Sequence, residues 1–149
     1  RELLMFFGRL HEMPGAAIEE RIDELSAQFQ MEEFLDRRCE KLSTGMKQKV
    51  SIARTILHSP QVIILDEPTM GLDVLTSRSI VSFIHQCRQE KRTVLFSSHI
   101  MSEVEQLCDR VAVIHEGRRY FLGKLTDLRT KYGDNTEEAF LKVLEGAKE

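Results

Sequence analysis

Two adjacent carboxylates, Asp66 and Glu67, follow directly after an apolar run at residues 62–65. A run this uniformly apolar is typical of a strand in a parallel sheet that is covered on both faces. Open α/β sheets bind their ligands at the carboxyl ends of such strands. At that place one carboxylate can hold a magnesium ion, and a second can orient and polarise an attacking water molecule. Taken alone, the same pattern also fits an ordinary strand end with solvated acids.

The segments on either side of this strand carry further polar candidates. Ser43, Thr44 and Gly45 come just before a predicted helix, whose N-terminus would be open to a phosphate. The alternative is that Ser43 or Thr44 only caps that helix. After the strand, a proline and a glycine favour a tight turn, from which Asp73 is expected to project.

His99 follows a second apolar run, residues 93–96, again at the expected carboxyl end of a strand. A neutral imidazole there could donate a hydrogen bond to a phosphate oxygen and so report whether the terminal phosphate is present. The alternative is a surface histidine without a role. The remaining histidines share no metal-like spacing, and no local signature of a Ser-His-Asp or Cys-His site is present.

The elements that must position these residues follow from the spacing of apolar side chains. The first forty residues predict helices, with a stripe at Ile18, Ile22, Leu25 and Phe29 and a short third helix at residues 32–38. From Gly45 onward, helices alternate with apolar strands. Strands are predicted at residues 62–65, 93–96 and 111–114, with a short strand at 119–122 and closing helices at 124–131 and 136–147. This order favours a right-handed parallel α/β sheet.

Composition excludes several classes of protein. The chain has 149 residues, 42% hydrophobic and 30% charged, with a net charge of −3, which fits a globular domain and disfavours nucleic-acid binding. Its three widely spaced cysteines indicate neither a disulfide framework nor a zinc site, so a reducing cytoplasm fits best. No apolar run approaches the roughly 20 residues of a membrane-spanning helix.

Three motifs in this order closely resemble the second half of an ABC-type ATPase domain: residues 42–48, 65–73 and 97–99. The resemblance covers nearly the whole chain. Residues 97–110 resemble the corresponding segment of ATPases that pair with separate export-type membrane subunits, including sodium, drug and polysaccharide exporters. It implies roles for single residues. They are Ser43, Thr44 and Gly45 in the signature motif that binds ATP held by the opposite subunit, Asp66 as the magnesium-linked aspartate, Glu67 as the catalytic base, Asp73 in the dimer contact and His99 as the switch histidine.

The resemblance also implies cofactors, partners and a location. ATP and Mg²⁺ are the expected cofactors, a second ATP-binding subunit the head-to-tail partner, and an integral membrane permease the partner that holds the protein at the cytoplasmic face. Residues 1–38 would face the permease. Two residues depart from the family pattern: Thr44 stands where a second glycine is usual, and Met46 where glutamine is usual. Thr44 could crowd the phosphate or add a contact to it.

One expected motif is absent from these 149 residues, namely the Gly-rich loop ending in Lys-Ser or Lys-Thr that holds nucleotide phosphates. The Gly123-Lys124 pair is followed by Leu125 and lacks the upstream glycine. We therefore expect a fragment, with the loop upstream of Arg1. By resemblance, the strand before that loop lies between strands 93–96 and 111–114. Without it, the chain is expected either to swap strands into an oligomer or to fold with altered strand pairing.

The sequence thus predicts an α/β protein with a partial P-loop NTPase fold. Its segments are a helical signature subdomain (1–58), the second half of the ATPase core (59–123) and a C-terminal helical extension (124–149). The expected function is ATP-driven export, with no hydrolysis by this chain alone. Two alternatives stay open: a non-catalytic partner that lends a signature motif to another ATPase, and a soluble ABC ATPase without a transport role.

Overall fold

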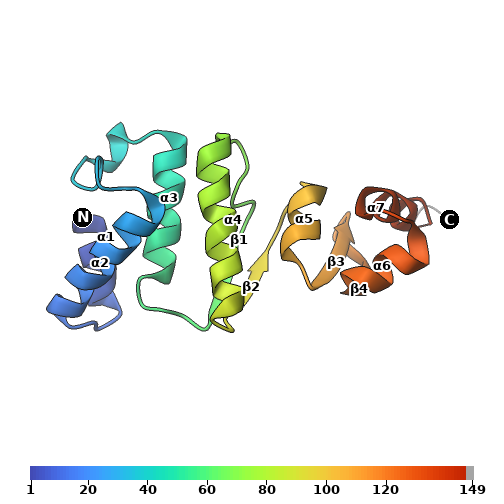
Figure 1. Cartoon of the computed structure of the whole chain (residues 1–149), viewed down its shortest axis with the longest axis horizontal. Coiled ribbons are helices and arrows are strands. Elements are labelled where there is room, and N and C mark those ends of the chain that lie inside the picture. The colour runs from blue at the N-terminus through green and yellow to red at the C-terminus, as the bar shows by residue number, and fades with distance from the viewer. Residues whose placement is uncertain (147–149) are drawn as a thin grey trace. The chain divides into compact units, whose positions relative to one another are not determined.

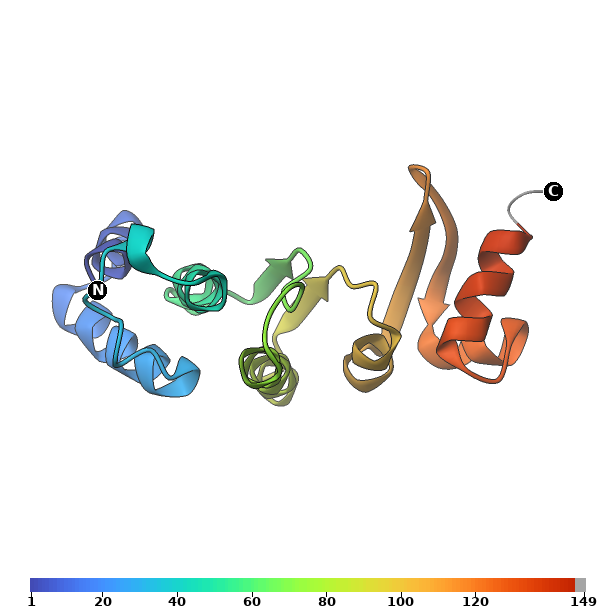
Figure 2. The same ribbon diagram turned by 90° about the horizontal axis from the view of Figure 1, so that it is seen from above.

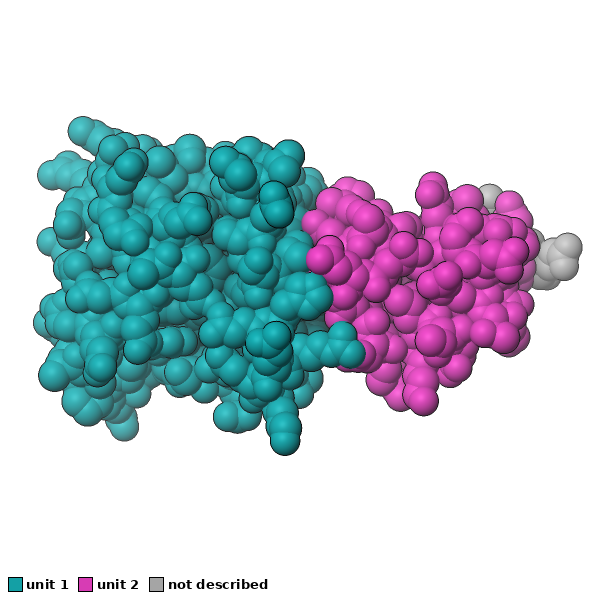
Figure 3. Space-filling model, in the orientation of Figure 1, with its two compact units in different colours: residues 1–97 teal, residues 98–149 magenta. Residues whose placement is uncertain are grey.

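The computed structural model describes residues 1–146, and these fall into two compact units that divide between Ser97 and Ser98 (Figure 3). The first unit contains the acid pair and the signature-like segment, and the second contains His99. The three segments predicted from the sequence remain a prediction. The last three residues of the third segment, including the predicted helix end at Ala147, lie outside the described residues.

The elements alternate as the apolar pattern predicts (Figure 1). The first unit contains α1 (Glu2–Leu10), α2 (Gly15–Phe29), a short 3₁₀ turn (Cys39–Lys41), α3 (Thr44–Ile56), β1 (Val62–Leu65), α4 (Val74–Gln89) and β2 (Thr93–Phe96). The second unit contains α5 (Met101–Leu107), β3 (Arg110–His115), β4 (Arg118–Lys124), α6 (Leu125–Tyr132) and α7 (Thr136–Glu145).

The helical front follows its apolar stripe closely. In α2, the four predicted stripe residues are fully buried, which confirms the expected face. The helix ends at Gln30, which adopts a left-handed conformation. The helix predicted at residues 32–38 is wrong, because that stretch forms successive turns. Phe34 and Leu35 are nevertheless buried, so burial of two apolar side chains does not require a helix there.

The sheet of the first unit consists of β1 and β2, paired in parallel with Leu65 opposite Phe96. Helix α4 lies along one face of this pair (Figure 2) and packs against β2. Along β1, Ile63 and Leu65 are buried. On the opposite face, the exposed apolar side chains are Val62 (59% exposed), Ile64 (68%) and Leu95 (62%). The expectation that both faces are covered is therefore wrong, since alternate side chains of a strand point to opposite faces and α4 covers one of them.

The second unit is built on an antiparallel hairpin. Strand β3 pairs with β4 through the two-residue turn Glu116-Gly117, in which both residues have positive φ, 47° and 72°. Paired positive φ values are those of a type I′ turn, whose twist matches the flanking strands. The strand predicted at residues 111–114 exists, but it belongs to this hairpin and does not extend the parallel pair.

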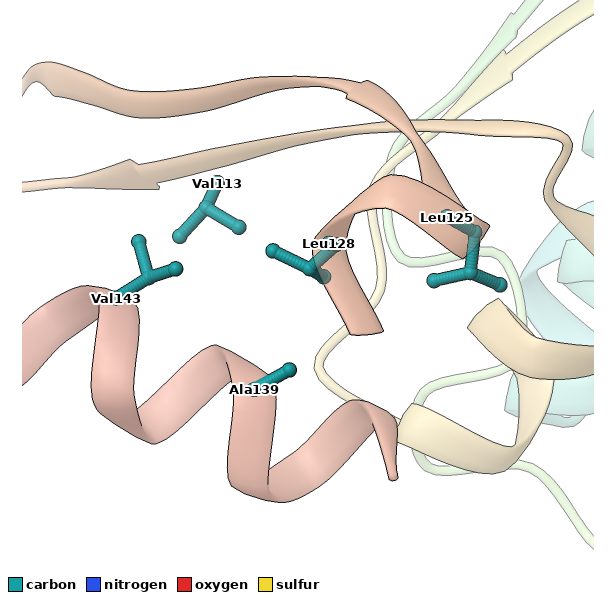
Figure 4. Close-up of a cluster of buried hydrophobic side chains, with 5 residues drawn as sticks. All are labelled: Val113, Leu125, Leu128, Ala139 and Val143. Carbon is teal, nitrogen blue, oxygen red and sulfur yellow. The ribbon is translucent and has the colours of Figure 1, made fainter. Parts of the chain in front are cut away.

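Helices α6 and α7 cover one side of the hairpin and enclose a core of five buried side chains (Figure 4). They are Val113, Leu125, Leu128, Ala139 and Val143. Each helix contributes through residues three or four apart, which is the spacing that keeps side chains on one helical face. The second unit thus has a hydrophobic core of its own.

Candidate active site

The register of β1 against β2 brings Asp66 next to Ser97. Because Leu65 and Phe96 form the last strand pair, the following residues of both strands lie level with each other, and the Ser97 amide donates to the Leu65 carbonyl at 3.0 Å. The Ser97 hydroxyl donates to Asp66 Oδ1 at 2.5 Å, and it accepts from the Glu67 amide at 2.8 Å. The Ser97 side chain, directly after β2, therefore contacts both members of the acid pair.

The backbone turns sharply at Glu67, which has a φ of 42°. A positive φ is uncommon outside glycine and persists where the surroundings fix it. Besides Ser97, the loop is held by the Met70 amide, which donates to the Glu67 carbonyl at 3.1 Å, and by Gln48 Nε2, which donates to the Pro68 carbonyl at 3.1 Å. Helix α3 therefore supports the loop that carries Glu67.

Asp73 lies at the N-terminus of α4 and caps it. Its Oδ1 accepts from the Thr76 amide at 2.9 Å, and its Oδ2 accepts from the Thr76 hydroxyl at 2.8 Å. Both bonds favour the ionised carboxylate and so hold the pKa of Asp73 below its usual value. The bond from the Thr76 amide has the larger effect, and the bond from the Thr76 hydroxyl comes second. The side chain is exposed, yet it folds back onto its own helix.

Ser43 caps α3 in the same way, since its Oγ accepts from the Met46 amide at 3.3 Å. Thr44 is the first residue of the helix and is exposed, and Gly45 is half-buried. A Cβ atom on Gly45 would lie 3.4 Å from Thr76 Oγ1 and 3.6 Å from Asp73 Oδ2, which are ordinary contacts. The starts of α3 and α4 thus lie side by side, and packing inside the chain does not require a glycine there.

His99 belongs to the second unit, in the loop between β2 and α5, and it is exposed. The loop is shaped by Ser98, whose hydroxyl donates to Glu103 Oε2 at 3.0 Å and accepts from the Ile100 amide at 3.1 Å. The first unit therefore gathers the acid pair and the two helix starts, and His99 lies outside that unit.

Sequence reasoning missed three residues that support the site: Ser97, Thr76 and Gln48. In the sequence, Ser97 stands out only as a member of the motif that contains His99. The signal that could have identified it is its place directly after β2, in the position that corresponds to Asp66 after β1. Thr76 stands three residues after Asp73, which is the spacing of a helix N-cap interaction.

The polar groups of the first unit are chemically compatible with a magnesium nucleotide. Within residues 1–146, no group of three or more His, Cys, Asp or Glu side chains could hold a metal. Mg²⁺ in proteins commonly uses one or two carboxylates together with substrate phosphates and water. The exposed Asp66 carboxylate provides one such ligand, and Glu67 is adjacent to it. The α3 N-terminus offers backbone N–H groups suited to a phosphate.

A parallel strand pair with an acid pair at a strand end, and a capped helix N-terminus carrying Ser-Thr-Gly, is compatible with an ATP-binding domain. The chain belongs to the ABC transporter ATP-binding family: residues 3–70 match the family model described as "ABC transporter". The α/β fold is supported by a solved "Structure of ATP binding subunit of ABC transporter", with a TM-score of 0.87 and 29% identity over 96% of this chain and 61% of that one.

Curated relatives agree with this family. The ABC transporter ATP-binding protein NatA of Bacillus subtilis is 46% identical over 86% of this chain and 52% of its own length. The Nod factor export ATP-binding protein I of Rhizobium meliloti is 39% identical over 83% of this chain and 37% of its own length. The chain thus spans about half or less of the relatives it matches. Within the described residues, none of the helices combines the length and apolar character needed to span a membrane.

Proposed function

We propose that this chain forms part of the ATP-binding subunit of an ABC transporter, in which ATP binding and hydrolysis drive export across a membrane. The observation that carries the proposal is the acid pair Asp66-Glu67 directly after β1, where the Ser97 hydroxyl bonds to the Asp66 carboxylate and to the Glu67 amide. The names of the relatives support it, because both are ATP-binding proteins and one is an export protein.

In the proposed reaction, Glu67 accepts a proton from a water molecule as that water attacks the terminal phosphorus of ATP. The bond between that phosphorus and the bridging oxygen breaks, and ADP leaves with the electron pair. Asp66 would hold Mg²⁺, which neutralises the negative charge of the phosphates when it is bound. His99 would contact the terminal phosphate as a neutral imidazole.

Ser43, Thr44 and Gly45 would bind the terminal phosphate of an ATP held by a second subunit. Support comes from Gly45, because the chain leaves room for a Cβ atom at this position and the glycine is therefore not a packing requirement. A glycine there allows a close approach of another molecule to the backbone. Asp73 lies beside it and would take part in the contact between the two subunits.

The proposed assembly is a head-to-tail pair of ATP-binding subunits attached to an integral membrane permease at the cytoplasmic face. Residues 1–58 would form the helical signature part of each subunit, residues 59–123 part of the catalytic core and residues 124–149 a helical extension. We expect residues 1–149 alone not to hydrolyse ATP, because they contain no phosphate-binding loop to position the nucleotide.

The test compares phosphate release by residues 1–149 with that of a chimaera, in which the portion of the Bacillus subtilis relative that precedes its matched stretch is joined ahead of Arg1. The chimaera is expected to hydrolyse ATP, and the chain alone is not. Glu67→Gln should abolish turnover in the chimaera. Glu20→Gln, an exposed acid on α2, is the matched control and should not.

Two results would contradict the proposal. One is turnover by the chimaera that survives Glu67→Gln, which would exclude Glu67 as the base. The other is a folded chimaera that binds ATP without hydrolysing it, which would favour a non-catalytic partner that lends its signature motif to another ATPase.

A further inference from the structure

Ser97 occupies a distinctive place in the first unit, because a single hydroxyl contacts both residues of the acid pair. A serine hydroxyl has one proton to donate and two lone pairs that accept. Here the proton goes to Asp66 Oδ1, and a lone pair receives the amide proton of Glu67. The donating capacity of the side chain is therefore fully used within the site.

The bond to Asp66 has the geometry of a strong interaction. Its length of 2.5 Å falls in the range of hydroxyl-to-carboxylate bonds, which are shorter and stronger than bonds between neutral groups. Asp66 and Ser97 are both exposed, so apolar packing does not fix the direction of either side chain. The terminal torsion of an aspartate is also intrinsically broad. The hydrogen bond from Ser97 is accordingly what restricts the carboxylate.

The bond from Glu67 acts on the backbone. Glu67 holds a left-handed φ of 42°, a conformation that needs support from its surroundings. Its amide proton points to Ser97 Oγ at 2.8 Å, and the loop beyond it is tied to α3 through Gln48. The backbone turn at Glu67 is therefore supported by an acceptor on Ser97, directly after β2.

We propose that Ser97 is the positioning residue of this site: through one hydroxyl it sets the direction of the Asp66 carboxylate and the backbone turn at Glu67. The inference rests on the proposed function only for the roles of those two acids. The geometric statement concerns this chain alone, and it needs no nucleotide to be tested. Ser97 itself touches no reacting atom.

The experiment is NMR spectroscopy of residues 1–149 without nucleotide or metal. Three-bond couplings from the backbone nitrogen and carbonyl carbon to Cγ of Asp66 report whether that side chain holds one rotamer. Hydrogen exchange of the Glu67 amide reports its bond to Ser97 Oγ. Both quantities are measured in the wild type and in Ser97→Ala. Two control variants are measured beside them: Ser97→Thr, which keeps the hydroxyl at this exposed site, and Ser82→Ala, which changes an exposed serine on α4.

We expect single-rotamer couplings at Asp66 and a protected Glu67 amide in three proteins: the wild type, the Ser97→Thr variant and the Ser82→Ala variant. In Ser97→Ala we expect averaged couplings and an amide that exchanges roughly tenfold faster, the effect of losing one hydrogen bond. Averaged couplings in the wild type overturn the inference without any variant, so it stays testable even if Ser97→Ala does not fold. Unchanged couplings and exchange in a folded Ser97→Ala overturn it as well.

These readouts separate the inference from the proposed function. A chimaera that fails to hydrolyse ATP, in a chain whose Asp66 couplings behave as expected, refutes the function and leaves the role of Ser97 intact. Averaged couplings at Asp66 in a chain whose chimaera is active refute the role of Ser97 alone.

Discussion

Helices α1 and α2 approach each other at Gly8, and this contact predicts the effect of adding a single methyl group. An ideal Cβ atom on Gly8 would lie 2.7, 2.8 and 2.9 Å from Cγ1, Cγ2 and Cδ1 of Ile18. Ile18 is completely buried in α2, and its branched side chain has few other rotamers to adopt. Gly8→Ala should therefore force the two helices apart.

The magnitude follows from two opposing effects. Overpacking of a core costs about 1–3 kcal/mol, and three simultaneous overlaps place Gly8→Ala near the upper end. Alanine in place of glycine inside a helix returns about 1 kcal/mol. We expect Gly8→Ala to lower the free energy of unfolding of the first unit by about 2 kcal/mol. Gly45→Ala, the same change where the new contacts are no shorter than 3.4 Å, should instead raise it by about 0.5 kcal/mol.

The assay is urea denaturation followed by circular dichroism, combined with native-state hydrogen exchange of the amides of α1 and α2, which assigns the change to the first unit. Removing the Ile18 side chain beyond Cβ tests the cause, since Ile18→Ala deletes all three overlapping atoms. In the double variant the two changes should be non-additive by at least about 1 kcal/mol. A Gly8→Ala protein as stable as the wild type, or strictly additive changes, would refute the steric explanation.

Three further predictions concern the pH dependence of stability, the hydrophobic core of the second unit and the reactivity of the cysteine thiols. The hydrogen bonds that lower the pKa of Asp73 give stability that is present above its unfolded-state pKa and is lost as pH falls through the folded-state value. Asp73→Asn should therefore weaken the pH dependence of the urea midpoint between about pH 5 and pH 2. A midpoint that falls with pH as steeply as in the wild type would contradict this. Leu128→Ala, at a side chain 2% exposed, should destabilise the second unit by about 3 kcal/mol. Hydrogen exchange of the amides of β3 and β4 should accelerate as a result. Acceleration confined to the first unit would contradict this prediction. Burial raises the pKa of Cys87 and of Cys108 to about 11, so iodoacetamide at neutral pH should modify the exposed Cys39 first by mass spectrometry; equal rates at all three would show that burial does not protect them.

How far the sequence predicted the fold depended on the length and regularity of each pattern. The stripe from Ile18 to Phe29 spans three turns, and the structure confirms each of its positions. The stretch at residues 32–38 is long enough for barely two helical turns, and it forms successive non-helical turns instead. An apolar strand also does not reveal its partner, so the pattern at residues 111–114 alone does not distinguish a parallel sheet from the hairpin that β3 forms with β4.

The candidate site shows the same limit. Asp66 and Glu67 could be placed at a strand end because the apolar run before them is local information. The bond from Ser97 could not be predicted, since it depends on the register between two strands that α4 separates in the sequence. The cap at Asp73 lies between these cases: its spacing to Thr76 is local information, but the proline and glycine before it fit a projecting turn residue as well as a helix cap.

The two-residue turn at Glu116-Gly117 has a consequence for the order in which the chain folds. Strands β3 and β4 are neighbours in sequence, so closing their turn loses little chain entropy, and hairpins of this kind form in about 1–10 μs. Strands β1 and β2 are separated in the sequence by α4, so their pairing closes a much longer loop, and such non-local pairing slows folding. Pulse-labelled hydrogen exchange should therefore protect the amides of β3 and β4 before those of β1 and β2, so that the acid pair is oriented late in folding.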